Sequence, residues 1–539
     1  MRMSSRSPQR RQGASPVPFS VIACVFLLLS TVFSGGIAYQ LHRLSTPVFG
    51  SAGGMPVTPT YLVMLVLDGA RPEYMHLTRL PHLDALRRQG VEYDRALAGI
   101  LESETPSGHA ALSTGSTPAR DGLLGFNWIT SVNDAVRLFD PNVVRAGGIE
   151  KVMQHAGAPT IASLFKRRYP RAKVVAVSGH KYYAADPLGG PNADYILYYQ
   201  PDNKNHYVPT AIPGHVPPAA ILDAPHLSWS STVMPLGGED SIAVRLALSS
   251  FAHVHQQITL INLPEFDWPL GHVYGSDGVH AKALMQSFDR DLGRIENAYR
   301  KAGVLDKTLF VVTADHGMSP LAYQIPDTVL DNAVSQTGTK ELEATYSTAG
   351  YLWLQDPSRA QAVADNIVRA KEKHVQSVYY KVSGKSGDVF VRDANLGVSP
   401  AVDRANQTLL QSFLGGNAPD VVAFCTENAA FVTRGAESWK GNHGGAAWQS
   451  QHLPLIIAGA GVAPVGVSHA PARLEDVAPT ALSIMGVRPT GMQGTALSDA
   501  LQNPSAAQTR SRAALDRSLT PVVDALITQS RAESKAAGR

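Results

Sequence analysis

The sequence predicts an α/β fold in which helices flank a central, mostly parallel sheet. Short apolar runs recur at wide spacing along the chain, at residues 61–69, 172–179, 258–267, 308–317 and 453–461. Helical patterning lies between them and is clearest at residues 280–303, where apolar residues return every three or four positions. Apolar strands that alternate with helices are typical of a parallel sheet covered on both faces.

Composition excludes several classes of protein. Hydrophobic residues make up 44% and charged residues 17% of the 539-residue chain, which is ordinary for a globular protein. Five arginines precede the first acidic residue, Asp68, so the formal net charge of +3 leaves the rest of the chain close to neutral and predicts no nucleic-acid groove. Cys24 and Cys425 are the two cysteines. They cannot build a cysteine cluster, so any metal must use histidine and carboxylate ligands.

The N-terminal region predicts attachment to a membrane. Residues 18–40 are uncharged, mostly apolar and about long enough to span a bilayer. Four arginines precede them, so by the positive-inside rule residues 1–17 stay cytoplasmic and the catalytic part is extracytoplasmic, in a periplasm or outside the cell. The alternative is a cleaved signal sequence. Residues 41–58, rich in Pro, Gly and Ser, are interpreted as a linker.

The rest of the chain divides into a catalytic domain and a tail. We assign residues 59–500 to the catalytic domain, with an inserted α+β subdomain at 318–440 that contains several strand-like segments. Residues 501–539 are predicted to form a polar helical tail without a motif.

Carboxylates and histidines follow three of the predicted strands. Asp68, Asp267 and the pair Asp315–His316 each come where an apolar run ends. In open α/β sheets ligands bind outside the carboxyl ends of the strands, so these side chains are expected to meet. With His272 and His443 they make three carboxylates and three imidazoles, which suit two zinc-like ions.

Residues 101–123 contain many hydroxyl groups, and Thr105 is the best placed of them for chemistry. Thr105 followed by Pro106 is a strong start signal for a helix that Gly115 would close. We therefore expect Thr105 to be the N-cap, where the helix dipole and a bound metal would favour its alkoxide form. Ser113 would lie about 12 Å further along the helix, too far to share that metal.

Several motifs together resemble the alkaline phosphatase superfamily, and most of all its type I phosphodiesterase/nucleotide pyrophosphatase branch. The motifs are, in order, VLDG, ETPSGHAALSTG followed by PARDGLLG, DWPLGH, TADHG and GNHGG, and they span about residues 60–490. The resemblance implies a hydrolase of phosphate esters with two zinc ions, or other divalent transition metals, that acts through a phospho-threonine at Thr105. It places one metal on Asp68, Thr105, Asp315 and His316, and the other on Asp267, His272 and His443. Asn127 matches the asparagine that steadies a phosphoryl oxygen in the family.

The sequence departs from the family's pattern in ways that bear on the substrate. The step from Asp267 to His272 is five residues, where four is common. Lys181 resembles the first residue of a Lys-x-Arg pair that places cations against phosphate in phosphomonoesterases of the superfamily, but Tyr183 stands in place of the arginine. STPAR, residues 116–120, imitates a sulfatase signature but follows the LSTG segment instead of preceding it.

The substrate is therefore expected to be a small phosphate ester. The resemblance implies phosphodiesters or nucleotide pyrophosphates first and phosphomonoesters second. An envelope phospholipid head-group transferase stays open as an alternative, because such enzymes use a similar threonine and a membrane anchor. The sequence leaves the oligomeric state open.

Overall fold

The computed structural model describes residues 58–536, apart from 131–133, 141, 144–146, 203–205, 224–226, 229–235, 386 and 434. The predicted cytoplasmic segment, the anchor at residues 18–40 and nearly all of the linker therefore lie outside the described residues. Among the described residues, no helix combines the length and apolar character needed to cross a bilayer. Residues 49–539 belong to one compact unit.

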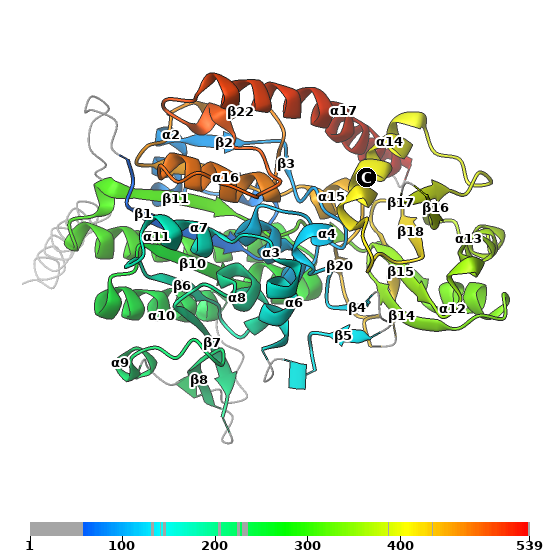
Figure 1. Ribbon diagram of the computed structural model, residues 1–539, viewed down its shortest axis with the longest axis horizontal. Helices are drawn as coiled ribbons and strands as arrows, with labels where there is room; N and C mark the ends of the chain where they lie inside the picture. Colours follow the sequence, from blue (N-terminus) through cyan, green and yellow to red (C-terminus); the bar gives the residue numbers. More distant parts are fainter. Residues whose placement is uncertain are drawn as a thin grey trace, which may run out of the picture. The chain divides into compact units, whose positions relative to one another are not determined.

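A ten-stranded sheet forms the centre of the molecule (Figure 1). Its strands lie in the order β22 (Gly466–Ser468), β2 (Val91–Tyr93), β21 (Leu455–Gly459), β11 (Thr308–Thr313), β1 (Tyr61–Leu67), β10 (Ile258–Leu263), β6 (Val174–Val177), β7 (Tyr195–Pro201), β8 (His206–Ala211) and β9 (Leu227–Ser228). From β11 to β7 all neighbours are parallel. Four predicted runs, at 61–69, 172–179, 258–267 and 308–317, supply four of these five strands.

The sheet as a whole is mixed: most neighbouring pairs are parallel, as predicted, but both outer parts contain antiparallel pairs. β21, the strand of the run at 453–461, is antiparallel to β11 and to β2, and β8 is antiparallel to both β7 and β9. An apolar run shows that a strand is buried on both faces but carries no signal of its direction. The parallel part nevertheless contains β1, β10 and β11, the strands that precede Asp68, Asp267 and Asp315.

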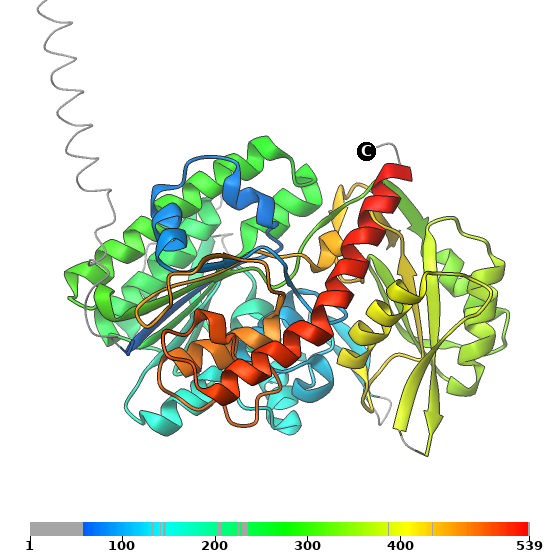
Figure 2. The ribbon, with the colours of Figure 1, turned by 90° about the horizontal axis from the view of Figure 1, so that it is seen from above.

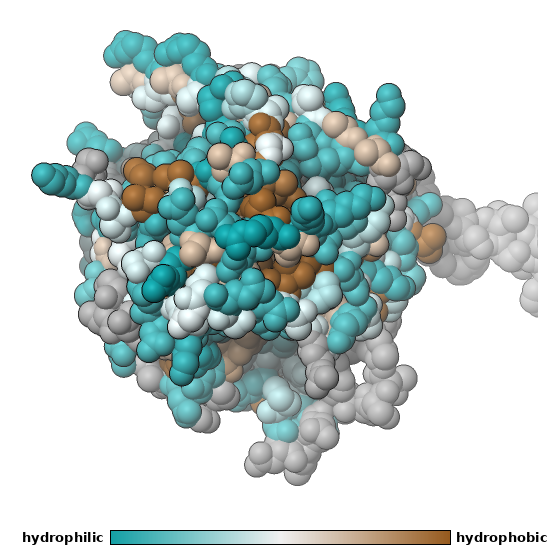
Figure 3. Space-filling model, turned by 90° about the vertical axis from the view of Figure 1, so that its right-hand side faces the viewer, coloured by the Kyte–Doolittle hydropathy of each residue, from teal (hydrophilic) through white to brown (hydrophobic). Residues whose placement is uncertain are grey.

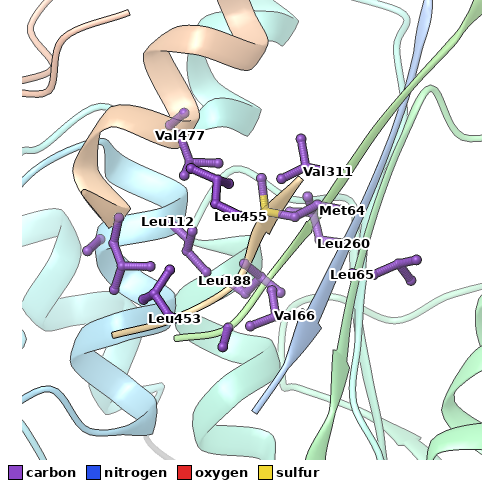
Figure 4. Packing of buried hydrophobic residues seen from close by; sticks show 14 of the residues in the cluster. Met64, Leu65, Val66, Leu112, Leu188, Leu260, Val311, Leu453, Leu455 and Val477 are labelled. Atoms are coloured by element: carbon purple, nitrogen blue, oxygen red, sulfur yellow. The ribbon is translucent and has the colours of Figure 1, made fainter. Parts of the chain in front are cut away.

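Helices cover both faces of this sheet. One face carries α3 (Thr105–Thr114), α6 (Gly148–Ala156), α7 (Ile161–Arg168), α8 (Tyr182–Gly189) and α16 (Leu474–Ile484), and the other carries α2 (Pro81–Gln89), α10 (Gly238–Val254) and α11 (Gly278–Lys301). Figure 4 shows the alternation of β1: Met64 and Val66 point toward Leu112 of α3 and Leu188 of α8, whereas Leu65 points to the opposite side. All of these side chains are fully buried.

A second, antiparallel sheet lies within residues 341–425. Its strands are, in order, β14 (Glu341–Tyr346), β15 (Ala349–Leu354), β18 (Val421–Cys425), β16 (Val375–Gly384) and β17 (Gly387–Arg392), and its helices are α12 (Thr328–Ser335), α13 (Ala360–Arg369) and α14 (Pro400–Leu410). It has its own apolar core. The side of the molecule where this sheet lies is mostly hydrophilic with scattered apolar areas (Figure 3).

Short elements connect these layers. They are β3 (Ala96–Leu97), α4 (Pro118–Asp121), β4 (Asn127–Ile129), β5 (Ala135–Arg137), α9 (Ala219–Leu222), β12 (Ser319–Pro320), β13 (Tyr323–Pro326), β19 (Ala429–Val432), β20 (Gly441–Asn442), α15 (Trp448–Gln451) and β23 (Ala472–Arg473).

The predicted polar tail is an amphipathic helix that packs against both parts of the protein. α17 (Ala506–Ala536) runs from the main sheet to the second sheet (Figures 1 and 2). It buries Leu515, Leu519 and Val523, and near its end the Glu533 carboxylate accepts a hydrogen bond from Gln376 of β16 at 3.1 Å. The tail is therefore part of the folded body.

Candidate metal centre

The carboxyl edge of the parallel strands brings the predicted ligands together. β1, β10 and β11 are adjacent, so the loops that follow them carry Asp68, Asp267 and Asp315 to one place. The backbone N–H of Gly69 donates to Asp315 Oδ1 at 3.0 Å and ties two of these loops together. Gly69 has φ +71°, and a Cβ here would lie 3.2 Å from the His316 ring, so glycine allows this close approach.

His443 reaches the site through a short strand pair. β20 (Gly441–Asn442) is antiparallel to β12 (Ser319–Pro320), which follows His316 by three residues. The pair places the His443 ring on the His316 ring, with centroids 3.5 Å apart. The segment between these two histidines therefore contains the second sheet, although their rings are in contact.

The five-residue step from Asp267 to His272 is accommodated by a wider turn. Residues Asp267–Tyr274 have π-type hydrogen bonding, in which residues five apart are joined, with an extended Trp268 inside it. His272 Nε2 consequently lies 3.0 Å from Asp267 Oδ1. The longer spacing thus keeps both side chains on the same site.

The ligand atoms form two overlapping groups. Asp267, His316 and His443 form one group that could hold a metal ion, and Asp68, Asp315 and His316 form the other. His316 Nε2 lies 3.5 Å from Asp68 Oδ1 and 3.4 Å from Asp315 Oδ2, while His443 Nε2 lies 3.5 Å from Asp267 Oδ1. His316 thus occurs in both groups, whereas the resemblance placed it only with Asp68, Thr105 and Asp315.

Each of the three imidazoles is oriented by a backbone carbonyl. Nδ1 of His272 lies 2.8 Å from Gly441 O, Nδ1 of His316 lies 2.9 Å from Gly317 O, and Nδ1 of His443 lies 3.0 Å from Ser103 O. An Nδ1–H that donates to a carbonyl leaves Nε2 as the lone-pair nitrogen, which is how ligating histidines are usually oriented. All three Nε2 atoms face the carboxylates.

Several of these atoms fit metal coordination better than hydrogen bonding. Asp267 Oδ1, Asp315 Oδ2 and His316 Nε2 are buried and make no hydrogen bond with a described residue. Imidazole nitrogens and carboxylate oxygens lie 3.0–3.5 Å apart here without hydrogen-bond geometry. Buried polar atoms rarely stay unsatisfied, so this donor set of carboxylate and imidazole fits bound divalent ions.

Without metal, the site balances its own charges. Burial would lower the pKa of His316, but Asp315 and then Asp68 raise it to about 9, so the ring is protonated at neutral pH. Burial and the neighbouring His316 lower the pKa of His443 to about 4. Burial would likewise lower the pKa of Lys181, but Asp267 and Asp68 hold it well above its usual value. Three carboxylates thus face two protonated groups.

Thr105 lies at the start of α3 with its hydroxyl toward this cluster. Its Oγ1 is 3.4 Å from Asp68 Oδ1, and the residue is 2% exposed. The N-cap is Glu104, not Thr105 as we predicted: Glu104 and Ser107 form a reciprocal capping box, and Thr105 is the first helical residue. Because Glu104 does the capping, the Thr105 hydroxyl remains available for other contacts.

Glycine also sets the position of α3. A Cβ at Gly108 would lie 2.4 Å from the carbonyl oxygen of Asp315, so only glycine lets this helix pack directly on the metal-site loop. Gly115 ends the helix in a left-handed conformation with φ +57°, as predicted.

A cavity of about 550 Å³ opens over the cluster and contains the other predicted catalytic residues. Thr105, Asn127 and Lys181 all line it. Lys181 is 2% exposed, and its Nζ lies 2.6 Å from Asp267 Oδ2 and 3.0 Å from Asp68 Oδ1. It therefore bridges the two metal-binding groups.

Aromatic side chains form two walls of the cavity, and sequence analysis missed them. Phe126 stacks on Phe139 with centroids 4.3 Å apart, and Tyr183 meets both rings edge-on. Trp268 and Trp439 lie on the side of His272. β14 of the second sheet adds a further part of the lining, so the predicted insertion borders the cavity.

Ser107 and Ser116, two other hydroxyl residues of 101–123, have local structural contacts. Ser107 Oγ completes the capping box of α3, and Ser116 Oγ bonds the Thr114 carbonyl at 3.3 Å. Arg120 of the STPAR stretch bonds the carbonyls of Ala156 and Gly157. None of these residues, nor Ser113, lines the cavity.

A buried asparagine supports one of the two groups, the one formed by Asp68, Asp315 and His316, and it too was missed. Asn262 Nδ2 donates to Asp68 Oδ2 at 2.7 Å and lies 3.0 Å from His109 Nε2, and its Oδ1 accepts from Ser178 at 2.6 Å. His109 Nδ1 in turn faces the Thr105 carbonyl at 2.7 Å and Asp315 Oδ2 at 3.2 Å. In the sequence, Asn262 stands out only as an asparagine in a strand that is otherwise apolar except for one threonine, ITLINL.

This network assigns a positioning role to Asn262. Because Asp68 Oδ2 is held by the amide, Asp68 Oδ1 is directed at Thr105, Lys181 and His316. We expect Asn262→Leu, which keeps the approximate volume, to weaken binding of one metal equivalent by roughly 10–100-fold, as for other residues that orient metal ligands. Chelator competition measures this directly.

The matched control is Ser178→Ala, which removes the outer hydrogen bond and leaves the Asn262–Asp68 contact intact. It should change metal affinity far less. Equal metal affinity in Asn262→Leu and the unaltered protein would contradict the positioning role.

Comparisons with known proteins agree with this architecture. The sequence pattern of the type I phosphodiesterase/nucleotide pyrophosphatase family matches residues 62–446. Alkaline phosphatase PhoK of Sphingomonas sp. is 26% identical over 349 residues, which cover 54% of this chain and 61% of PhoK. The chain thus spans less than two thirds of that relative. Alkaline phosphatase PhoD of Zymomonas mobilis is 30% identical over 118 residues, or 21% of this chain and 20% of PhoD.

Two solved structures share the fold. Alkaline phosphatase PafA superposes with a TM-score of 0.63 at 16% identity, over 83% of this chain and 100% of that one. Murine ectonucleotide pyrophosphatase/phosphodiesterase 5, in an inactive threonine-to-alanine form with AMP, gives 0.57 at 15% identity, over 82% and 100%. Since the family pattern covers most of the chain and the site, this protein belongs to the type I phosphodiesterase/nucleotide pyrophosphatase family.

Proposed function

We propose that this protein hydrolyses phosphate esters with two divalent metal ions, most simply zinc, through a covalent phospho-Thr105. One observation carries the proposal: Thr105 lines the cavity, and its hydroxyl lies 3.4 Å from Asp68, which belongs to one of the two groups of carboxylate and imidazole. The inactive form of the murine relative is named for a threonine-to-alanine change, which supports a threonine nucleophile here.

The metal ligands are assigned as the family resemblance implies, and the distances in the site support this assignment. Asp68, Thr105, Asp315 and His316 would hold one ion, and Asp267, His272 and His443 the other, with His316 close to both groups. Bound metal would supply Lewis-acid stabilisation of phosphoryl charge and a lower pKa for the threonine hydroxyl.

The chain's own residues perform the remaining steps. Thr105 Oγ attacks phosphorus, the ester oxygen leaves, and water later cleaves the phospho-threonine and restores the hydroxyl. The Lys181 ammonium stays charged and offers a donor to a phosphoryl oxygen, replacing its contacts to Asp68 and Asp267. Asn127 lines the same cavity and would donate to another phosphoryl oxygen.

The lining of the cavity favours a diester with an apolar or planar substituent. Beside the one buried ammonium of Lys181, the wall consists of Phe126, Phe139 and Tyr183, and Phe139 is 55% exposed. A diester anion carries one negative charge and a second organic group, which this aromatic wall can contact. Phosphomonoesters are the second candidate, because two related proteins are named alkaline phosphatases.

We also propose that residues 18–40 anchor the protein in a membrane with the catalytic part outside the cytoplasm. The apolar run after four arginines supports this orientation. An intact N-terminus in the membrane fraction is the expected result, and a soluble form that starts near residue 40 would indicate a cleaved signal sequence instead.

The substrate class is tested by comparing kcat/KM for bis(p-nitrophenyl) phosphate and p-nitrophenyl phosphate. We expect the diester to be preferred. Phe139→Ala should lower kcat/KM for the diester by about two- to twelvefold, the loss expected for one aromatic contact, and should leave the monoester nearly unchanged.

Val279→Ala is the matched control, because Val279 is 78% exposed and does not line the cavity. A monoester preference, together with equal losses for both substrates in Phe139→Ala, would favour the phosphomonoesterase.

A further inference from the structure

The amino ends of the parallel strands form a continuous surface on the edge of the sheet opposite the metal centre. The backbone N–H of Thr60 donates to Lys307 O at 3.0 Å, that of Leu62 to Gln257 O at 2.8 Å, and that of Gln257 to Lys173 O at 3.0 Å. These bonds hold the loops before β11, β1, β10 and β6 side by side. They define one face to which loops distant in sequence contribute.

This surface is rich in exposed cations. Arg167 and Arg168 end α7, Arg171 follows, and Lys301 and Lys307 come from the end of α11 and the loop after it; all five are exposed. We call these five residues, together with Tyr169, the basic face. Asp194 is already engaged by Lys166 at 3.1 Å and Lys173 at 2.9 Å. Asp306 is the exposed carboxylate in these loops.

The basic face also has an apolar component. A cavity of about 510 Å³ lies here, lined by Pro59, Phe165, Tyr169, Pro170 and Ala172 among others. Tyr169 is 38% exposed, and the Arg168 guanidinium lies 5.0 Å from its ring centroid. Exposed tyrosine beside arginine is typical of surfaces that meet the head-group region of a bilayer.

The chain itself emerges from this face. Pro59 and Thr60 line the apolar cavity, and the sequence before them leads through the linker to the apolar run at 18–40. A linker of this length spans about 60 Å when fully extended, and about 23 Å on average as a flexible coil. Such a tether gives the basic face a high effective concentration at the membrane, so a few weak contacts suffice.

We propose that the basic face binds anionic phospholipid head groups of the membrane to which the protein is attached. Arginine and lysine side chains near a bilayer are attracted by its negative surface potential within about one Debye length. After the five N-terminal arginines the chain has 42 Lys and Arg against 44 Asp and Glu, so the basic face is a local excess of cations that can orient the protein. The proposal rests on the proposed anchor for the identity of the membrane and for the tether that concentrates the basic face there.

This orientation determines where the catalytic cavity opens. β1 has seven residues, so Asp68 lies about 23 Å beyond the start of the strand. Docking through the amino edge would direct the metal centre away from the bilayer, toward substrates in solution. This orientation of the protein disfavours head-group transfer on lipids of the same membrane.

The experiment uses the full-length chain in nanodiscs of phosphatidylcholine with or without phosphatidylglycerol. Cys24→Ser removes one native cysteine, and the other, Cys425, is buried. An environment-sensitive fluorophore can therefore be attached to the introduced cysteine of Tyr169→Cys. We expect a blue shift of its emission in the anionic discs alone, reversed by high salt. Arg167→Gln, Arg168→Gln and Arg171→Gln combined should abolish the shift and leave diester turnover unchanged.

Matched controls separate this result from general charge effects. The same label at Ser335→Cys on α12 should not respond, and Lys282→Gln, Arg290→Gln and Lys340→Gln combined should keep the shift at residue 169. Identical emission in both kinds of disc would overturn the proposal. So would a shift caused by short duplex DNA and not by anionic lipid.

Failure of the anchor gives a different result. The protein would then leave the discs, and co-sedimentation of this released form with phosphatidylglycerol vesicles would still measure lipid binding by the basic face.

Discussion

Thr105→Ala is expected to lower turnover of a phosphodiester by several orders of magnitude. The change removes the cavity hydroxyl that lies 3.4 Å from Asp68, so hydrolysis would need direct attack by water without a covalent step. The fold should persist, because Glu104 and Ser107 cap α3 without help from the Thr105 side chain. Steady-state kinetics and metal content of the same preparation measure both effects.

Conservative and neighbouring variants sharpen this test. Thr105→Ser should keep appreciable activity, since a primary hydroxyl can occupy the same position. Ser107→Ala should cost only stability through the lost capping bond, and Ser116→Ala should have little effect. Loss of activity in Ser116→Ala, with Thr105→Ala still active, would revive the sulfatase-like interpretation of STPAR.

Removal of metal is expected to abolish activity, and His443→Ala should remove one of two bound equivalents. His443 Nε2 faces Asp267 and stands apart from the Asp68–Asp315 pair, so its loss should empty the site on Asp267 preferentially. Elemental analysis after dialysis should find close to two equivalents of a transition metal in the unaltered protein and close to one in the variant. Magnesium alone would contradict the assignment.

The same titration has a pH dependence with a definite sign. The pKa of His316 is about 9 in the metal-free site, so at neutral pH a metal must displace its proton. Affinity should therefore rise as pH increases from 7 to 9 and level off above that.

The parallel core and the ligand positions were predictable because buried strands and the polar residues that end them leave a local signal. Asp68 and Asp315 follow uninterrupted apolar strands, and the fold needs only adjacency of β1 and β11 to join them. The predicted helix at 280–303 is α11, Gly278–Lys301, since its period is long and regular.

Other features depend on contacts between distant segments and left no such signal. The direction of β21 is set by its partners β11 and β2, not by its own residues. The N-cap is Glu104 because its side chain and that of Ser107 form a reciprocal capping box. The prediction chose Thr105 because it gave more weight to the Thr-Pro step. Asn262 and the Phe126–Phe139 stack acquire their roles only once the sheet and loops are assembled.

The dispersal of the ligands along the chain has a consequence for biogenesis. The bond from Gly69 to Asp315 joins residues 246 positions apart, and His443 comes later still. Such distant pairings are slow to form, because the chain must lose the entropy of loop closure before the stabilising contacts form. Because a growing polypeptide holds only part of the proposed ligand set, we expect metal to bind only after the whole chain has folded.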